Sequence, residues 1–292
     1  MSRRAARVGG SQVFLREGEL FTLGQLMEAI VVASANDACV AVAEHLAGSA
    51  EAFAETMNAK ARALGLEHTR CVNVHGLDDT PPGSGNVTTA YDLAQIARVL
   101  VRHPQIIEWS STVEKPFREG KFTLHTTNKL LGRYEGLDGL KTGYTGRAGF
   151  CLVATAKRDD MRLIAVVMGT PSDRVRAREV SRLLDWGFAN FTRVRLAAPG
   201  QPLGTVAVSW GCESEVRAVV PDGACVVLRP EQERQLSRRL ELPGKTPAPI
   251  AAGQPLGRLA VSLGDSTIAV FPLVAEKAVA RATLWEKLTS WF

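Results

Sequence analysis

The sequence predicts an α+β domain followed by a smaller all-β domain. Three features indicate this order. Apolar residues recur at helical spacing through much of 22–103, two buried strands and a covering helix follow within 149–191, and short strands punctuated by Gly and Pro fill 194–274. Helices, then strands, then a covering helix are typical of an α+β layer arrangement. The 292 residues, 46% of them hydrophobic, supply enough apolar material for one large or two medium domains.

The first third of the chain is expected to form three helices. Thr22 and Gln25 have the spacing of a capping box and open the first of them. Helical spacing pauses at Ala33–Asp37, where serine, asparagine and aspartate cluster, and these residue types favour caps and turns over helix interiors. The side chains of Ser34 and Asn36 are therefore expected to emerge at the boundary between two helices.

The middle of the chain changes from loop to strands. Residues 71–88 are rich in turn formers and predict a long loop, a kind of segment that is often functional. Segments 112–117 and 121–124 resemble a hairpin. The two buried strands are expected at Gly149–Lys157 and Arg162–Gly169, and the short turn between them favours antiparallel pairing.

The C-terminal part is expected to be a small β-sandwich with a helical tail. The periodicity places the first domain at 1–192, the sandwich at 193–275 and the tail at 276–292. The tail carries an apolar face with two tryptophans and nearby cations, which suits a helix lying in a membrane interface; packing against the sandwich is the alternative. That face consists of Leu284, Trp285, Leu288, Trp291 and Phe292.

Composition excludes several classes of function. The formal net charge is +5, but no dense block of Lys and Arg with interleaved aromatics appears, so we expect no nucleic-acid partner. The cysteines and histidines are scattered without metal-ligand spacing, so we expect no metal site, no cofactor and no disulfide framework. Buried free thiols are the expected state of the five cysteines, which are Cys39, Cys71, Cys151, Cys212 and Cys225.

Two short motifs point to chemistry. Lys141-Thr142-Gly143 stands just before a buried strand, and Ser34-Ala35-Asn36 lies at the interruption between two helices. A Lys-Thr-Gly tripeptide alone is a weak signal. Together, Ser-x-Asn and Lys-Thr-Gly are two of the three motifs of the penicillin-binding serine enzymes.

The chain resembles the low-molecular-mass D-alanyl-D-alanine carboxypeptidases, penicillin-binding proteins of the peptidase S11 family. The resemblance extends over nearly the whole chain, including the sandwich and tail, and its blocks occur in the family's order. It implies a serine β-lactamase/transpeptidase-like fold for the first domain, N-terminally truncated in this chain. The blocks are residues 10–19, 33–45, 73–78, 89–94, 128–131, 138–145, 148–156, 162–169 and 184–188.

The resemblance implies a serine acyl-enzyme mechanism on peptidoglycan stem peptides that end in D-Ala-D-Ala. By this likeness, Ser34 and Asn36 belong to a proton relay and contact the substrate amide. Lys141 supplies positive charge beside the nucleophile and attracts the anionic substrate. The backbone N–H of Tyr144 forms half of the oxyanion hole.

The resemblance also implies a set of substrate-binding residues. Thr142 hydrogen-bonds the substrate carboxylate, and Gly143 lets the peptide approach the strand edge. Arg176 matches a family arginine that recognises the terminal carboxylate, a task for which bidentate geometry favours Arg over Lys. His75, on the loop beside the cleft, is a further candidate.

The family's Ser-x-x-Lys motif, which carries the nucleophile, does not occur in the sequence. No serine has a lysine three positions later, and Thr126 with Lys129 has the spacing but the wrong nucleophile. We expect this motif and a signal peptide to lie upstream in a longer gene, and the chain as given to be inactive. The loss of the motif's helix is expected to expose apolar surface and to lower the yield of folded protein.

Two readings of function follow, an enzyme and a binding protein. The first is a D-Ala-D-Ala carboxypeptidase at the extracytoplasmic face of the membrane, held there by its C-terminal helix and inhibited by β-lactams as the longer chain. The alternative is a catalytically dead truncated homologue that binds peptidoglycan or a partner. A β-lactamase fits poorly, because the sandwich and the tail resemble carboxypeptidase parts.

Overall fold

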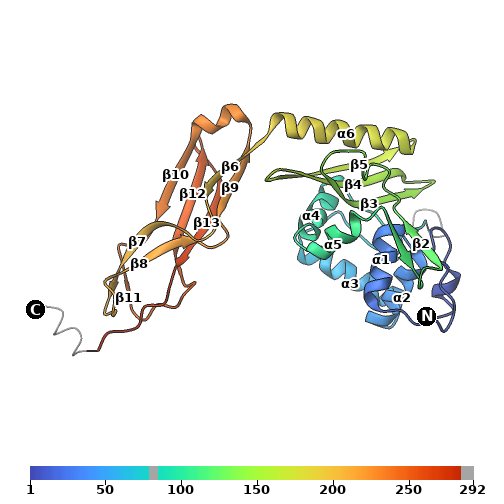
Figure 1. Ribbon diagram of the computed structural model, residues 1–292, viewed down its shortest axis with the longest axis horizontal. Coiled ribbons are helices and arrows are strands. Elements are labelled where there is room, and N and C mark those ends of the chain that lie inside the picture. Colours follow the sequence, from blue (N-terminus) through green and yellow to red (C-terminus); the bar gives the residue numbers. More distant parts are fainter. Residues whose placement is uncertain (79–84, 284–292) are drawn as a thin grey trace, which may run out of the picture. The chain divides into compact units, whose positions relative to one another are not determined.

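The computed structural model describes residues 1–78 and 85–283. The chain forms two compact units, Met1–Phe188 and Ala189–Phe292, which we describe separately (Figure 1). The first unit combines helices with a sheet and the second is built of strands. The predicted α+β class with a β-rich C-terminal part is therefore confirmed.

Five helices lie in the first half of the described chain, and a sixth, α6, follows the sheet. The capping box predicted at Thr22 and Gln25 is present, with both reciprocal hydrogen bonds formed. Ser49 and Thr89 cap two later helices through their hydroxyls. The helices are α1 (Leu23–Ala33), α2 (Asn36–Ala47), α3 (Ala50–Ala63), α4 (Ala90–Leu100), α5 (Pro104–Ser110) and α6 (Asp173–Asn190), preceded by a 3₁₀ turn, Ala5–Arg7.

An antiparallel sheet of the order β3-β4-β5 lies between helical layers. Figure 1 shows α6 across one face of this sheet and α4 and α5 on the other. Val180 and Leu184 of α6 are buried against Leu152 and Ala154 of β4. The strands of this unit are the predicted hairpin, β1 (Glu114–Phe117) and β2 (Phe122–His125), and the sheet strands β3 (Leu137–Thr145), β4 (Gly149–Arg158) and β5 (Met161–Thr170).

The second unit contains a six-stranded sheet of the order β10-β12-β13-β8-β7-β11 and a two-stranded sheet, β6-β9. Alternate residues of both sheets enter one core, in which Val206, Val216, Val261 and Leu273 are fully buried. The strands are β6 (Thr192–Ala197), β7 (Gln201–Ser209), β8 (Glu215–Val220), β9 (Ala224–Leu228), β10 (Leu236–Glu241), β11 (Lys245–Pro247), β12 (Pro255–Leu263) and β13 (Ser266–Ala275), with a 3₁₀ turn at Pro230–Gln235.

The tail differs from its predicted helix where the structure describes it. Residues 276–283 are not helical; Val279 forms a bridge with Ile250 and is only 1% exposed, and Arg281 forms a bridge with Gly211. The sandwich core captures Val279, so a helix starting at residue 276 is wrong. The apolar face predicted at 284–292 lies outside the described residues.

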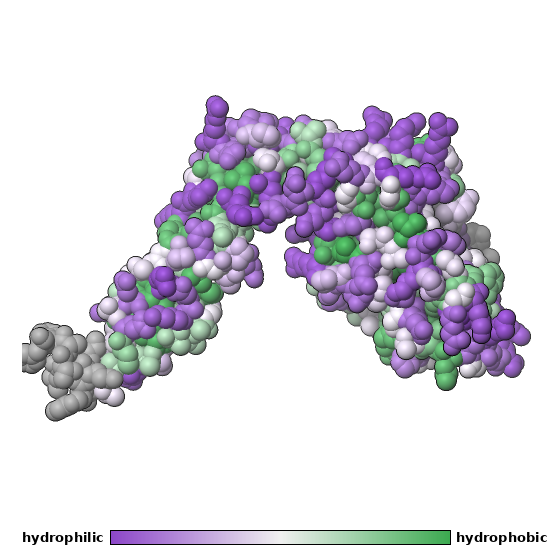
Figure 2. Space-filling view, viewed as in Figure 1, coloured by the Kyte–Doolittle hydropathy of each residue, from purple (hydrophilic) through white to green (hydrophobic). Residues whose placement is uncertain are grey.

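The visible surface of the protein is mainly hydrophilic. On the face shown in Figure 2, hydrophilic residues predominate, with smaller hydrophobic patches between them. No helix in the described ranges is long and apolar enough to cross a membrane.

The cysteines are free thiols, but the expectation that they are buried is wrong, because Cys212 is exposed and the other four are partly exposed.

Candidate active site

One cleft of about 900 Å³ in the first unit collects the residues that the sequence singled out. Its walls come from the α1–α2 junction, the loop after residue 72, strand β3 and the start of α6. All eight candidates line it, although they span more than 140 positions of sequence. They are Ser34, Asn36, His75, Lys141, Thr142, Gly143, Tyr144 and Arg176.

The break between α1 and α2 presents Ser34 to this cleft. Ser34 is the C-cap of α1 and adopts a left-handed conformation, with φ of 59° and ψ of 39°. A non-glycine residue in this region carries a modest conformational cost, and such residues are concentrated at functional sites. The left-handed residue ends α1 and allows α2 to begin at Asn36, so the predicted element boundary is correct.

Lys141 joins the sheet to this helical junction. Its Nζ donates hydrogen bonds to Ser34 Oγ at 2.6 Å and to the carbonyl of Thr142 at 2.9 Å. Burial, together with the positive charge of Arg176, lowers the pKa of Lys141 to about 8, although Cys39 opposes the change. Lys141 is therefore a cation close to its point of deprotonation at neutral pH.

Cys39 is the neighbour of Lys141 on the α2 side. Burial raises the pKa of its thiol to about 11, although the charge of Lys141 acts in the opposite direction. The thiol is therefore neutral at physiological pH, and Lys141 has no thiolate partner.

Asn36 ties the start of α2 to the segment before α1. Its Nδ2 donates to the carbonyl of Gly9 at 2.9 Å, and its backbone N–H donates to the carbonyl of Ser11 at 2.8 Å. Gly10 lies between these two and has φ of +78°. A Cβ on Gly10 would stand 2.6 Å from Asn36 Nδ2, so only glycine fits beside this side chain.

Asp37 binds the same segment through its carboxylate. Its carboxylate is 1% exposed and accepts hydrogen bonds from the backbone N–H groups of Val13, Leu15 and Ala38 at 3.0–3.3 Å. Among the described residues Asp37 forms no ion pair, and backbone donors satisfy its charge. The charge also lies in the first turn of α2, where the helix dipole favours an anion. A buried aspartate thus ties the segment after the cleft residues Gly10 and Ser11 to the start of α2.

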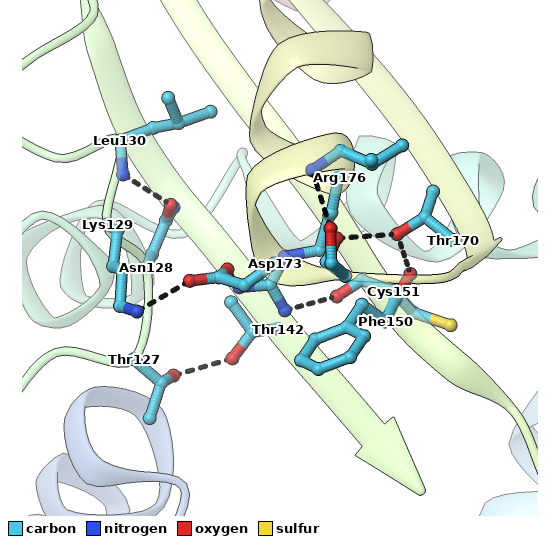
Figure 3. A network of polar contacts seen from close by, with 12 residues as sticks. Thr127, Asn128, Lys129, Leu130, Thr142, Phe150, Cys151, Thr170, Asp173 and Arg176 are labelled. Carbon is cyan, nitrogen blue, oxygen red and sulfur yellow. Dashed lines mark hydrogen bonds and ion pairs between the residues drawn. The ribbon is translucent and has the colours of Figure 1, made fainter. Parts of the chain in front are cut away.

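Strand β3 forms one wall of the cleft. Within the described sheet β3 pairs only with β4, so its other edge carries no strand. Side chains take three β3 carbonyls, those of Asp138, Gly139 and Thr142. Thr142 Oγ1 lies 2.6 Å from Thr127 Oγ1 in a hydroxyl–hydroxyl hydrogen bond (Figure 3). The Tyr144 ring is exposed and packs on Phe150, with the ring centroids 4.2 Å apart.

Arg176 lines the cleft from the first turns of α6 but is largely enclosed. Its side chain is 7% exposed, Nη1 donates to the carbonyl of Cys151 at 3.2 Å, and Nη2 forms an ion pair with Asp173. The guanidinium carbon lies 5.8 Å from the centre of the Phe150 ring. Nε is buried without a hydrogen-bond partner in the described part of the chain. Arg176 therefore reaches the cleft with its orientation already fixed.

A second cation shares the same carboxylate. Lys129 Nζ lies 2.7 Å from Asp173 Oδ2, and the Lys129 side chain is 71% exposed. Figure 3 shows Asp173 lying between Lys129 and Arg176, beside the Thr127–Thr142 pair. The cleft thus has a cationic end in which a buried arginine and an exposed lysine meet one aspartate.

His75 occupies the loop wall. Its Nδ1 accepts the backbone N–H of Leu77 at 3.2 Å, which places the proton of the neutral ring on Nε2. Asn73 shapes the turn, because its Oδ1 accepts the backbone N–H of Gly76 at 2.7 Å. Residues 79–84 of the predicted loop lie outside the described ranges.

Sequence reasoning missed four residues of the site: Asp37, Thr127, Lys129 and Asp173. The spacing of Asp173 and Arg176 on one helix was a readable signal, because residues three apart share a helix face. The position of Asp37 next to the Ser-x-Asn motif was a weaker signal. No pattern of neighbouring residues indicated that Lys129 would pair with Asp173 or Thr127 with Thr142.

Comparison with known families covers both units. Residues 1–172 match the D-alanyl-D-alanine carboxypeptidase family, peptidase S11. Residues 191–281 match the family described as penicillin-binding protein 5, C-terminal domain.

Curated relatives extend along almost the entire chain. D-alanyl-D-alanine carboxypeptidase DacF of Bacillus subtilis is 35% identical over 96% of this chain and 72% of its own length. D-alanyl-D-alanine carboxypeptidase DacC of Escherichia coli is 35% identical over 97% of this chain and 72% of its own length.

Solved structures agree with these matches. Penicillin-binding protein 5 of Haemophilus influenzae is 32% identical, with a TM-score of 0.74, over 93% of this chain and 78% of that one. A peptidoglycan synthesis regulatory factor (PBP3) of Streptococcus pneumoniae is 29% identical, with a TM-score of 0.79, over 94% of this chain and 82% of that one. The Ser-x-Asn and Lys-Thr-Gly motifs, their meeting in one cleft and these matches lead to one conclusion. The chain belongs to the peptidase S11 family of D-alanyl-D-alanine carboxypeptidases.

Proposed function

We propose that the cleft binds the C-terminal D-Ala-D-Ala of peptidoglycan stem peptides for serine-type carboxypeptidase chemistry. The observation that carries this proposal is the hydrogen bond from Lys141 to Ser34, because it assembles the two family motifs at one point. Membership of the carboxypeptidase family supports the choice of substrate.

Different residues of the cleft bind different parts of the peptide. The peptide lies along the edge of β3 that carries no strand in the described sheet, and Gly143 leaves room for its backbone. Thr142 and Arg176 receive the terminal carboxylate, one through a hydroxyl and the other through its guanidinium. The backbone N–H of Tyr144 donates to the carbonyl oxygen on which negative charge develops. His75 borders the same space from the loop.

In a longer chain that carries the Ser-x-x-Lys serine, the chemistry is an acyl transfer in two steps. A serine hydroxyl attacks the penultimate D-alanine carbonyl, the peptide bond breaks, and the terminal D-alanine leaves with the proton on its amine. Water then attacks the ester and regenerates the hydroxyl. Lys141 and Ser34 pass the proton to the leaving amine, a task suited to a lysine with a pKa of about 8, and Asn36 contacts the substrate amide beside this relay.

No serine of the sequence has a lysine three positions later, and we infer from this that the nucleophile is not among them. We infer that the 292-residue polypeptide binds the peptide without cleaving it. A relative from Listeria monocytogenes, penicillin-binding protein D2, was solved in an ampicillin-bound form at 32% identity and a TM-score of 0.57. β-Lactams are therefore expected to enter the cleft without acylating this polypeptide.

Two measurements on the full chain test this proposal. Calorimetric titration with diacetylated L-Lys-D-Ala-D-Ala should show saturable binding, and mass spectrometry after incubation with a labelled penicillin should show no covalent adduct. A covalent adduct would overturn the inference about the nucleophile. Failure to bind the peptide, with a folded protein, would overturn the proposed function itself.

We also propose an extracytoplasmic location at a membrane surface. Its support is the family's cell-wall substrate and the Trp-containing apolar pattern at 284–292. Co-sedimentation with anionic lipid vesicles tests it: the full chain should sediment, and the W285S/W291S double variant should remain in solution. Equal sedimentation of both proteins would exclude a role for this segment.

A further inference from the structure

Asp173 stands where an anionic ligand would be expected. Its carboxylate meets Lys129 at 2.7 Å on one oxygen and the guanidinium of Arg176 on the other (Figure 3). All three residues line the cleft, and so does Thr142. Lys129 and Arg176 are the cations available to bind the terminal carboxylate of the substrate at this end of the cleft. In the structure, the carboxylate of Asp173 already binds both of them.

The first turn of α6 keeps this carboxylate ionised. Ser172 caps the helix by accepting the backbone N–H of Val175, and Asp173 follows at the positive end of the helix dipole. Burial would raise the pKa of Asp173, but the hydrogen bond from Lys129 and the charge of Arg176 outweigh it, so the pKa is lowered. Lys129 and Arg176 therefore face a full negative charge at neutral pH.

The two cations respond differently to an incoming ligand. Arg176 is held by the Cys151 carbonyl and by the Phe150 ring as well as by Asp173, so it stays in place. The Lys129 side chain is 71% exposed, so it is free to turn from Asp173 to another acceptor. With Asp173 present the three residues carry a net charge of +1, the sum of two cations and one anion.

We propose that Asp173 is a specificity-determining residue, an internal carboxylate that competes with the substrate carboxylate for Lys129 and Arg176. It thereby lowers the preference of the cleft for a free C-terminal carboxylate over an uncharged C-terminus. This proposal rests on the proposed function, because it concerns the carboxylate-binding end of the same cleft.

The test compares two ligands that differ only at the C-terminus: diacetylated L-Lys-D-Ala-D-Ala and its C-terminal amide. In Asp173→Asn the side chain keeps its size and loses its charge. The dissociation constant of the acid should fall about fivefold at low salt, the scale of one partly exposed charge interaction, while that of the amide should stay unchanged. Glu179→Gln is the matched control: it removes the same charge from a partly exposed site on α6, where Glu179 pairs with Arg178 and Arg182, and should change neither constant.

A second variant tests the same ion pair without changing Asp173, in case Asp173→Asn alters the folding of the protein. Lys129→Met should weaken binding of the acid about threefold and leave the amide unaffected, because only the acid recruits Lys129. Thermal melts of each variant establish that the proteins compared are folded.

Three outcomes would overturn the proposal. In the first, Asp173→Asn weakens acid and amide alike, which is the mark of a merely structural aspartate. In the second, the ratio of acid to amide affinity is the same in wild type, Asp173→Asn and Lys129→Met. In the third, the wild type binds neither peptide, and the proposed function then fails as well. Binding of both peptides with an unchanged ratio contradicts the role of Asp173 alone.

Discussion

The ammonium of Lys141 donates a hydrogen bond of 2.6 Å to the hydroxyl of Ser34, across 107 positions of sequence. This bond joins the sheet to the junction of α1 and α2. It leaves the proton of the Ser34 hydroxyl available for donation, because a lysine ammonium only donates. The first prediction concerns the charge on this lysine.

Peptide binding should weaken as the pH rises through about 8, where burial places the pKa of Lys141. Below this pH the ammonium attracts the substrate carboxylate, and above it the neutral amine does not. We expect the dissociation constant of the acid peptide to rise about fivefold between pH 7 and pH 9. Titration calorimetry at several pH values measures it. The amide peptide is the control and should bind with little pH dependence, as should the acid peptide to Lys141→Met; a pH dependence that persists in Lys141→Met would contradict this assignment.

Asp37→Ala should destabilise the first unit strongly. The carboxylate accepts three backbone N–H groups in a buried position, and its removal leaves those donors without partners. We expect a loss of about 3 kcal/mol in the free energy of unfolding, measured by urea denaturation. Glu55→Gln, on the exposed face of α3, should change this free energy by less than about 0.5 kcal/mol. Equal effects of the two substitutions would refute the anchoring role.

Gly10→Ala should disturb the site where Gly9→Ala does not. At Gly10 a Cβ would clash with Asn36 Nδ2 and φ is positive, whereas nothing lies within 4 Å of a Cβ at Gly9. Gly10→Ala should cost about 1–3 kcal/mol of stability and weaken peptide binding. Chemical denaturation and calorimetry of the two variants measure both effects. A neutral Gly10→Ala would mean that Asn36 can move without consequence.

Thr142→Val should weaken the acid peptide more than the amide. Valine preserves the shape and strand preference of threonine but removes the hydroxyl offered to the carboxylate. We expect about a tenfold loss of affinity for the acid, the worth of one hydrogen bond to a charged group. Thr127→Val removes the same Thr127–Thr142 bond but keeps the Thr142 hydroxyl, so its effect should be smaller. Equal losses in the two variants would show that the bond between the threonines matters rather than contact with the ligand.

Much of the fold was predictable because its signals are local. The capping box at Thr22 and the helix break at Ser34 depend on neighbouring side chains and backbone groups only. The antiparallel strands β4 and β5 follow from two apolar runs joined by a short turn. The start of the tail, residues 276–283, was mispredicted because periodicity does not reveal that the sandwich core takes Val279.

The sequence by itself determined the class of fold, the order of its elements and the two family motifs that identify the chemistry. Only the tertiary structure decided how those motifs meet and which charges surround them. The pairing of Lys129 with Asp173, the enclosure of Arg176 and the lowered pKa of Lys141 arise from residues distant in sequence. The physical reason is that charge, burial and hydrogen bonding depend on distances in space, which local patterns of residues do not specify.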